Sequence, residues 1–288
     1  MTGTYSYTFD DVKDRPVAVI GAGTLGRRIA LMFAGRGGTV RIHARRAEQL
    51  ASATQYVTES LPKLLADRGF GEPGSVTAAD SLEEALDGAW LAVESVPEKI
   101  DVKTAIWGQI DRAAPPDTIF GTNSSSLPSR LMAEQVRDKT RLCNTHFYMP
   151  PGINAVELMS DGHTGRGLLD TLLRVLPEFG FRPFEVRRES TGFIFNRIWA
   201  AIKRESLTVV AEGVALPEDV DGMFKENWRV PVGPFQMMDQ VGLDVVLDIE
   251  SHYTAEFPYL PTRARDLLQA YVDAGKLGVK TGEGFYTY

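Results

Sequence analysis

Cysteine and histidine are scarce in this chain of 288 residues. There is a single cysteine, Cys143, and there are four histidines. An intrachain disulfide is therefore impossible, which fits a reducing compartment, and we expect a cytoplasmic protein. The sequence contains no Cys/His cluster and no H-E-x-x-H motif, so we expect no catalytic metal.

Long apolar runs and an excess of basic residues are also missing. No stretch approaches the length needed to span a bilayer, and the polar, acidic N-terminal residues lack the apolar core of a signal peptide. Lysine and arginine number 31 against 38 aspartates and glutamates, for a net charge of −7. Because a nucleic-acid-binding protein usually carries a basic stripe, we expect neither a nucleic acid nor a membrane as partner.

The chain does contain an alternation of strand-like and helix-like segments over its first two-thirds. Helical stretches such as 47–67 and 103–113 separate β-branched runs at residues 17–20, 39–43, 90–93, 118–121, 141–146 and 183–186. This alternation predicts a parallel sheet covered by helices on both faces. After Glu189 only helical spacing is found. We therefore predict an α/β domain over residues 1–188 and an all-helical domain over residues 189–288.

A glycine-rich turn connects the first strand to the helix after it. Its sequence is Gly21-Ala22-Gly23-Thr24-Leu25-Gly26. The first glycine permits a tight turn, the second lets backbone approach a pyrophosphate, and the third lets helix pack on strand. The helix N-terminus would offer N–H groups to the phosphates. A structural turn is the alternative, but the strand-to-helix context favours a Rossmann-type dinucleotide site, with Thr24 and Leu25 beside the cofactor.

The end of the second strand bears on the choice of cofactor. An NAD site usually has a carboxylate there for the ribose hydroxyl, whereas this chain has Arg45 and Arg46 after Ala44. Guanidinium groups match a 2′-phosphate in charge and geometry. The pattern favours NADP(H) over NAD(H), the alternative being a solvated pair of charges at the start of the next helix.

Several further segments, in this order along the chain, resemble the 3-hydroxyacyl-CoA dehydrogenase family, which has carnitine dehydrogenase and lambda-crystallin among its relatives. The resemblance rests on residues 118–127, 146–157, 192–197, 233–239 and 276–286. It covers the chain from about Pro16 to Tyr288. It implies a Rossmann-type doubly wound parallel sheet, an all-α C-terminal domain and a homodimer formed through that domain, to which the apolar content of residues 235–247 adds support.

The resemblance also implies roles for four catalytic residues. His146 matches the family's catalytic histidine, and an unperturbed pKa near 6.5 suits reversible proton transfer. Glu157 matches the glutamate that orients the imidazole. Ser125 and Asn196 match polar residues that hold the reacting oxygen. Ser126 remains an alternative to Ser125.

Three more matches lie on the cofactor side. Glu98 and Lys103 match positions near the nicotinamide ribose, and Asn123 is expected to face the cofactor. Each residue also has a structural alternative when taken singly: an exposed helix pair for Glu98 and Lys103, and a helix cap for the serine run or for Asn196.

Substrate choice is less constrained, because the chain departs from the family in three places. One is residues 225–229, Lys-Glu-Asn-Trp-Arg, where relatives often have glycines. The loop after Tyr148 has Met149-Pro150 where relatives commonly carry Asn-Pro. CoA-using relatives have a lysine-rich helical hairpin after the second strand, whereas residues 59–73 hold two basic and three acidic residues, and Pro62 is expected to shorten the first helix. Such a surface attracts a polyanion little.

We therefore predict an NAD(P)-dependent oxidoreductase acting on a 3-hydroxy or 3-oxo group of a small-molecule substrate, with a non-CoA substrate favoured. An imine reductase or a carnitine- or sugar-acid-type dehydrogenase is the enzymatic alternative. A non-catalytic, crystallin-like protein that binds the dinucleotide is the alternative of another class.

Overall fold

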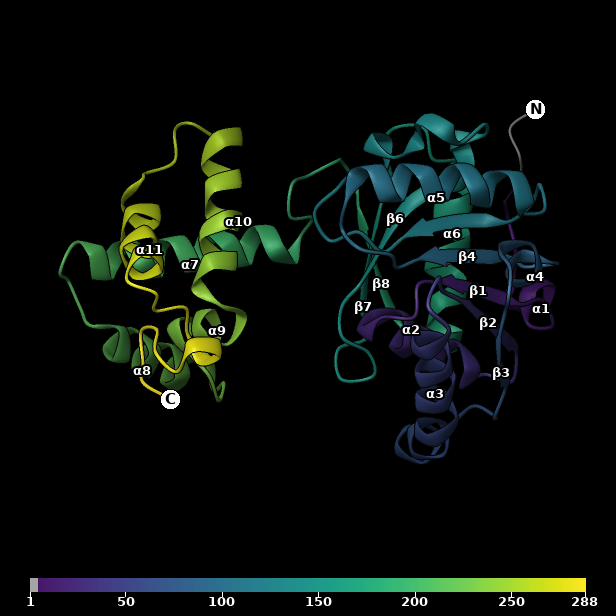
Figure 1. The fold of residues 1–288 in the computed structure, drawn as a ribbon, viewed down its shortest axis with the longest axis horizontal. Coiled ribbons are helices and arrows are strands. Elements are labelled where there is room, and N and C mark those ends of the chain that lie inside the picture. Colours follow the sequence, from purple (N-terminus) through teal and green to yellow (C-terminus); the bar gives the residue numbers. More distant parts are fainter. Residues whose placement is uncertain (1–4) are drawn as a thin grey trace. The chain divides into compact units, whose positions relative to one another are not determined.

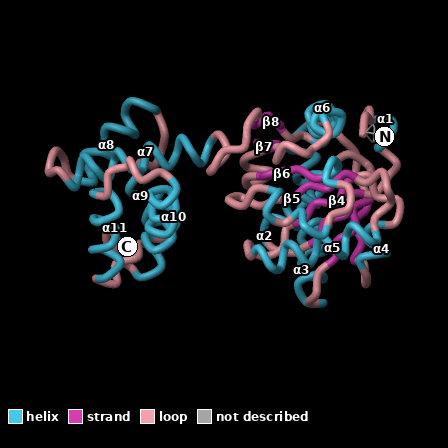
Figure 2. Tube along the Cα trace, turned by 90° about the horizontal axis from the view of Figure 1, so that it is seen from above, coloured by secondary structure: helices cyan, strands magenta, loops and turns pink. Residues whose placement is uncertain are grey.

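The computed structural model describes residues 5–288, and the chain divides into two compact units (Figure 1). The first unit ends at Ile194, and the second runs from Phe195 to Tyr288. All described strands lie in the first unit, as the colours of Figure 2 show. The division falls a few residues after the predicted boundary at 188. Residues 190–194 pack on the first unit, where Phe193 is buried with Met159 and Val186.

An eight-stranded sheet forms the centre of the first unit, in the order β3-β2-β1-β4-β5-β6-β7-β8. Neighbouring strands are parallel except β6 and β7, which are antiparallel. This is a Rossmann-type doubly wound sheet with an added antiparallel step. The strands are β1 (Val17–Ile20), β2 (Thr39–His43), β3 (Ser75–Ala78), β4 (Leu91–Glu94), β5 (Ile119–Thr122), β6 (Leu142–Phe147), β7 (Ala155–Met159) and β8 (Arg182–Val186).

Helices cover both faces of this sheet. Alternation along β1 explains how one strand serves two cores, because Val17 and Val19 face one and Ala18 and Ile20 the other. The first core lies under α2 (Thr24–Ala34), α3 (Ala47–Arg68) and α6 (Arg166–Val175), and the second under α4 (Leu82–Leu86) and α5 (Ile100–Ala113). A short α1 (Phe9–Val12) precedes the sheet. The predicted α/β architecture is confirmed.

The expectation that Pro62 shortens the helix after β2 is wrong. Helix α3 continues through Pro62 to Arg68. Pro62 itself is exposed, so the carbonyl that loses its partner can be hydrated, while the neighbours Leu61 and Leu64 are buried in the core. No second helix precedes β3 in this part of the described chain, since only residues 69–74 connect it to α3.

The second unit is all-helical. Its helices are α7 (Phe195–Ala211), α8 (Pro217–Trp228), α9 (Pro234–Val241), α10 (Leu243–Glu256) and α11 (Arg263–Asp273). Two buried carboxylates connect them: Asp221 accepts from the backbone of Phe235 at 2.8 Å, and Asp239 from that of Phe285 at 3.0 Å. A Cβ at Gly284 would lie 2.2 Å from the Asp239 carboxylate. The glycine-containing C-terminal motifs are thus required by packing.

None of the described helices is long and apolar enough to cross a bilayer.

Candidate active site

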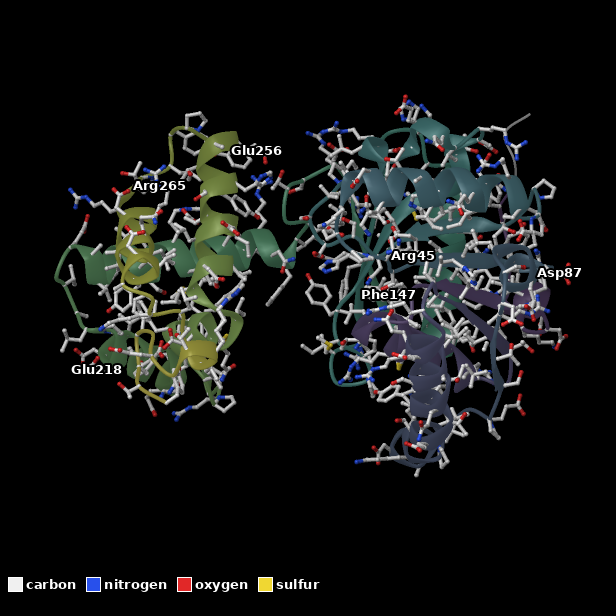
Figure 3. The ribbon with its side chains drawn as sticks, viewed as in Figure 1. Arg45, Asp87, Phe147, Glu218, Glu256 and Arg265 are labelled. Carbon is white, nitrogen blue, oxygen red and sulfur yellow. The ribbon has the colours of Figure 1, made fainter. Side chains whose placement is uncertain are left out.

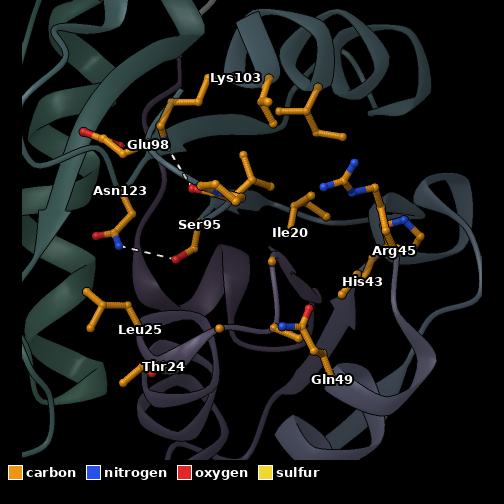
Figure 4. Close-up of a pocket in the computed structure, with 18 of the residues that line it drawn as sticks. Ile20, Thr24, Leu25, His43, Arg45, Gln49, Ser95, Glu98, Lys103 and Asn123 are labelled. Atoms are coloured by element: carbon orange, nitrogen blue, oxygen red, sulfur yellow. Dashed lines mark hydrogen bonds and ion pairs between the residues drawn. The ribbon is translucent and has the colours of Figure 1, made fainter. Parts of the chain in front are cut away.

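A cavity of about 1190 Å³ opens at the carboxyl ends of β1, β2, β4 and β5 in the first unit. Small-ligand sites commonly occupy about 300–1000 Å³, so this volume leaves room for a dinucleotide. In Figure 4, His43 and Arg45 lie at one end of the cavity and Ser95 and Asn123 at the other. This spread follows the strand order, because β2 and β5 lie on opposite sides of the β1–β4 pair.

The glycine turn has the geometry that a dinucleotide needs. Gly21 has φ +120°, and a Cβ there would lie 2.4 Å from the carbonyl oxygen of Ser95. A Cβ on Gly26 would lie 1.9 Å from the carbonyl oxygen of Gly21, so this glycine lets α2 pack against β1. A Cβ on Gly23 would meet nothing within 4 Å. Gly23 is the N-cap residue of α2 and leaves open space for a phosphate to approach the backbone.

Thr24, Leu25, Arg45 and Arg46 all line the cavity, and both arginines are exposed. Arg45 comes two residues after the end of β2, and its side chain is labelled in Figures 3 and 4. Among the described residues, no acidic side chain lies within ion-pair distance of either arginine. The described geometry leaves their charge available to an anionic ligand.

A buried lysine connects two carboxylates on the other side of the cavity. Lys103 is 1% exposed, and its Nζ lies 2.7 Å from Glu94 and 3.2 Å from Glu98. This burial excludes the alternative of an exposed helix pair. Burial acts to raise the pKa of Glu98, but the Lys103 ammonium and two serine hydroxyls outweigh it, so that this pKa is lowered. Glu98 is therefore ionised at neutral pH.

The serine run wraps around Glu98. The Ser124 hydroxyl donates to Oε1 of Glu98 and accepts from the backbone of Leu127, as in the capping alternative. The Ser126 hydroxyl also donates to Oε1, at 2.9 Å. Ser125 uses only its backbone N–H for this contact, at 3.2 Å, and it lines the cavity, as Asn123 does. This arrangement favours Ser125 over Ser126 as the residue that meets a substrate.

His146 and Glu157 face each other across the antiparallel pair of β6 and β7. The His146 Nδ1 lies 3.0 Å from Oε2 of Glu157, and both side chains are more than nine-tenths buried. His146 also lines the cavity. Because an ionised carboxylate only accepts, Nδ1 carries the proton and Nε2 is left with a lone pair. This pairing can hold an imidazole for proton transfer.

The structure thus brings together most of the predicted site. Glu157 and Gly26 do not line the cavity themselves: Glu157 contacts His146, and Gly26 packs α2 against Gly21 of the turn. Asn196 lies in the first turn of α7, in the second unit, and its place beside a substrate stays a prediction. Sequence reasoning missed Glu94, a buried carboxylate that ends β4 and accepts from Thr122 at 2.6 Å. The available signal was a glutamate at the end of an apolar strand, β4, which is the parallel neighbour of β1 and so ends beside the glycine turn.

No group of three or more His, Cys, Asp or Glu side chains among residues 5–288 is arranged to hold a metal ion.

Comparison with known proteins places this site in a family. The model for the 3-hydroxyacyl-CoA dehydrogenase NAD binding domain matches residues 16–190, and that for the 3-hydroxyacyl-CoA dehydrogenase C-terminal domain matches residues 192–288. The chain belongs to the 3-hydroxyacyl-CoA dehydrogenase family. It is an oxidoreductase of this family's type, acting on CH–OH groups with a nicotinamide cofactor.

Relatives of this dehydrogenase carry different substrate names. The 3-hydroxybutyryl-CoA dehydrogenase of Clostridioides difficile is 32% identical, over 94% of this chain and 99% of its own. The 5-formyl-3-hydroxy-2-methylpyridine 4-carboxylate 5-dehydrogenase of Mesorhizobium japonicum is 29% identical, over 95% and 91%. A solved structure of a diketoreductase acting on dicarbonyl compounds has TM-score 0.80 and 26% identity, and covers 96% of this chain and 100% of its own.

Proposed function

We propose that this dehydrogenase interconverts a 3-hydroxy and a 3-oxo group on a small substrate that is not a CoA thioester. Proton transfer in this proposal is supported by one observation, the buried His146–Glu157 pair at the edge of the dinucleotide cavity. A nicotinamide cofactor held in this cavity would supply the hydride chemistry. His146 Nε2 takes the hydroxyl proton during oxidation, and Glu157 stabilises the imidazolium that results.

Ser125 and Asn196 hold the reacting oxygen in this proposal. Ser125 is suited to it because its hydroxyl is free of the Glu98 contact that occupies its neighbours. Asn196 would supply a second donor from the first turn of α7. The pyrophosphate side of the cofactor would be held by Gly21, Gly23, Thr24 and Leu25, while Gly26 lets α2 pack against β1 behind them. The nicotinamide ribose side would be held by Glu98, Lys103 and Asn123.

The preference for a small substrate rests on the segment after β2. Helix α3 runs directly toward β3 with no second helix in the described residues 69–74, so the hairpin of CoA-using relatives is missing here. The segment is also slightly acidic. Two relatives named for small carbonyl substrates agree with this reading.

The deciding measurement compares kcat/KM for acetoacetyl-CoA with kcat/KM for small free 3-oxo acids, their esters and cyclic imines. We expect a higher value for a small substrate. A clear preference for the thioester, with saturation at micromolar concentration, would contradict the substrate proposal while leaving the reaction type intact. Highest turnover of the imines would favour the imine-reductase alternative. No turnover with any substrate, combined with tight dinucleotide binding, would favour the crystallin-like alternative.

We further propose that NADP(H) is preferred over NAD(H), through Arg45 and Arg46. The double variant Arg45→Ala/Arg46→Ala should lose most of the preference for NADPH, since a charge-assisted hydrogen bond contributes about 1.5–3 kcal/mol. Its kcat/KM with NADH should change little. Arg41→Ala is a matched control, because the Arg41 guanidinium is occupied by the backbone carbonyls of Glu84 and Asp87. A wild-type enzyme that prefers NADH would contradict the proposal.

A homodimer through the helical unit is also proposed. The apolar residues of 235–247 give it less support than their sequence suggested, because Phe235, Met238 and Leu243 are buried in the core of their own unit. Exposed apolar side chains on α8 support it instead: Met223 is 66% and Trp228 63% exposed. The cytoplasmic location stays a prediction.

A further inference from the structure

Tyr148 contacts both members of the His146–Glu157 pair and has no part in the mechanism above. Its hydroxyl donates to Oε2 of Glu157 at 2.8 Å, the oxygen that lies 3.0 Å from His146 Nδ1. Its ring centroid lies 4.5 Å from that of His146, with an angle of 44° between the planes. Two donors therefore meet at one carboxylate oxygen.

The position of Tyr148 follows from strand geometry at the end of β6. Successive side chains of a strand point to opposite faces, so His146 and Tyr148 share a face. Phe147 between them points into the core, where its ring centroid lies 4.9 Å from that of Phe181 (Phe147 is labelled in Figure 3). The Tyr148 N–H donates to the Ala155 carbonyl at 3.3 Å, which continues the pairing with β7 one residue beyond the strand.

Both oxygens of Glu157 are held. Oε1 accepts from the backbone N–H of Ile194 at 2.8 Å, and Oε2 accepts from Tyr148. The carboxylate is thereby oriented toward His146. Burial and the neighbouring carboxylate raise the pKa of Tyr148, so its hydroxyl stays protonated across the neutral range and can only donate to this oxygen.

We propose that Tyr148 is a positioning residue that sets the proton affinity of His146 through the Glu157 oxygen that they share. A hydrogen bond from the phenol neutralises part of the charge on Oε2, so the carboxylate stabilises the imidazolium less than it would without that donor. Tyr148 thus weakens the stabilisation that Glu157 gives to the protonated form of His146. This inference rests on the proposed role of His146.

The charged and titratable groups around His146 come from β7, from the residue after β6, from β4 and the loop after it, and from α5. Glu157 faces it from β7, and Tyr148 from the residue after β6. Glu98 and Lys103, from the loop after β4 and from α5, line the same cavity. Lys103 lies 3.2 Å from Glu98 and 2.7 Å from the buried Glu94 of β4, so this cluster holds two carboxylates and one ammonium group. The other ring packed on His146 is that of Phe193, which carries no charge and has its centroid 5.1 Å away.

The test is Tyr148→Phe, which removes one hydroxyl and keeps the ring. The pKa of His146 is read directly by NMR of histidine-labelled holoenzyme, where the His146→Gln variant identifies its signal among the four histidines. We expect this pKa to rise by about 0.5–1 pH unit, the size expected for one hydrogen bond. Because the base must be neutral to accept a proton, the acid limb of kcat/KM for alcohol oxidation should move to higher pH by the same amount.

Tyr5→Phe is the matched control, since the Tyr5 hydroxyl also donates to a carboxylate, Asp138, at 2.8 Å but away from the cavity. It should leave both the pKa of His146 and the pH profile unchanged. In a Glu157→Gln background, Tyr148→Phe should shift the His146 pKa much less, because the shared charge is gone.

Two results would overturn the inference: an unchanged His146 pKa in Tyr148→Phe, or an equal shift with and without the Glu157 carboxylate. If His146→Gln keeps normal turnover, the proposed role of His146 fails, but the NMR titration still decides whether Tyr148 sets its proton affinity.

Discussion

Lys103 holds two carboxylates in place beneath the cofactor cavity, and one of them, Glu94, is fully buried. Removing one partner of a buried ion pair leaves the other charge uncompensated, which costs about 3–5 kcal/mol. We therefore expect Lys103→Met to lower the free energy of unfolding by that amount, as measured by urea denaturation. Lys99→Met, at an exposed position just before the same helix, should change it little.

Glu98 makes stability depend on pH. Its pKa is lowered in the fold, whereas the pKa of an unfolded glutamate is about 4.3. Its ionised form therefore stabilises the protein above the unfolded-state pKa, and this contribution disappears as the pH falls through the lower folded-state pKa. Between about pH 4 and pH 7, the Glu98→Gln variant should be less stable than wild type. The difference should shrink at lower pH, and a difference that grew on acidification would contradict this assignment.

His146 is the residue on which turnover should depend most. His146→Gln keeps a polar side chain of similar size, so we expect the cofactor to bind normally while the chemical step slows by about 10²–10⁴-fold. Glu157→Gln should also slow it, since the imidazolium loses its charged partner. Single-turnover kinetics together with NADPH titration separate the two effects. Near-normal turnover of a folded His146→Gln variant would disprove the role.

Within the β1–α2 connection, two glycines should respond differently to the same change. Gly26→Ala forces a Cβ against the Gly21 carbonyl, so it should cost about 1–3 kcal/mol as overpacking does. Gly23→Ala meets no neighbour, and should keep stability yet weaken cofactor binding by blocking the approach to the pyrophosphate. Thermal unfolding and dinucleotide titration of both variants check the pair. Equal loss of stability in both would contradict the assigned roles.

Elements with a strong apolar pattern could be predicted from the sequence, and two strands could not. β1 and β2 have the predicted bounds because their residues pair on both sides within the sheet. β3 lies at the edge of the sheet and is mostly exposed, so its side chains carry little apolar signal. β7 has the charged residue Glu157 at its centre, which interrupts its apolar run. The family resemblance suggested His146 and Glu157. The pairing of β6 with β7 that brings them together could not be predicted from the local pattern of apolar and polar residues.

The chain as a whole is expected to form a dimer through exposed side chains of α8. Sedimentation velocity should show a two-chain species for the wild type. Met223→Asp, which places a charge in an exposed apolar patch, should shift the population toward the monomer. Glu226→Lys on the same helix, where Glu226 is 72% exposed and paired only with Arg229 in the described contacts, is the control for charge alone. A monomeric wild type would contradict the proposal.

The residues predicted for the site are divided between the two units of the chain. Every residue that lines the dinucleotide cavity belongs to the first unit, so sequence order and strand topology were enough to bring them together. Asn196 lies just beyond the junction at Ile194 and Phe195, where no strand register fixes its neighbours. Its role depends on how a helix meets a substrate, and local patterns carry no information about that.

Because of the antiparallel register of β6 and β7, the loop of residues 149–154 can be replaced without moving the two strands relative to each other. His146 stands opposite Glu157 because of the strands, and the hairpin loop between them can change in length or composition without altering that spacing. Variants with substitutions confined to this loop should keep the His146–Glu157 pair, so they can be screened for altered substrate preference. An insertion or a deletion in this loop would likewise leave the distance between His146 and Glu157 unchanged, since the strand pairing sets it.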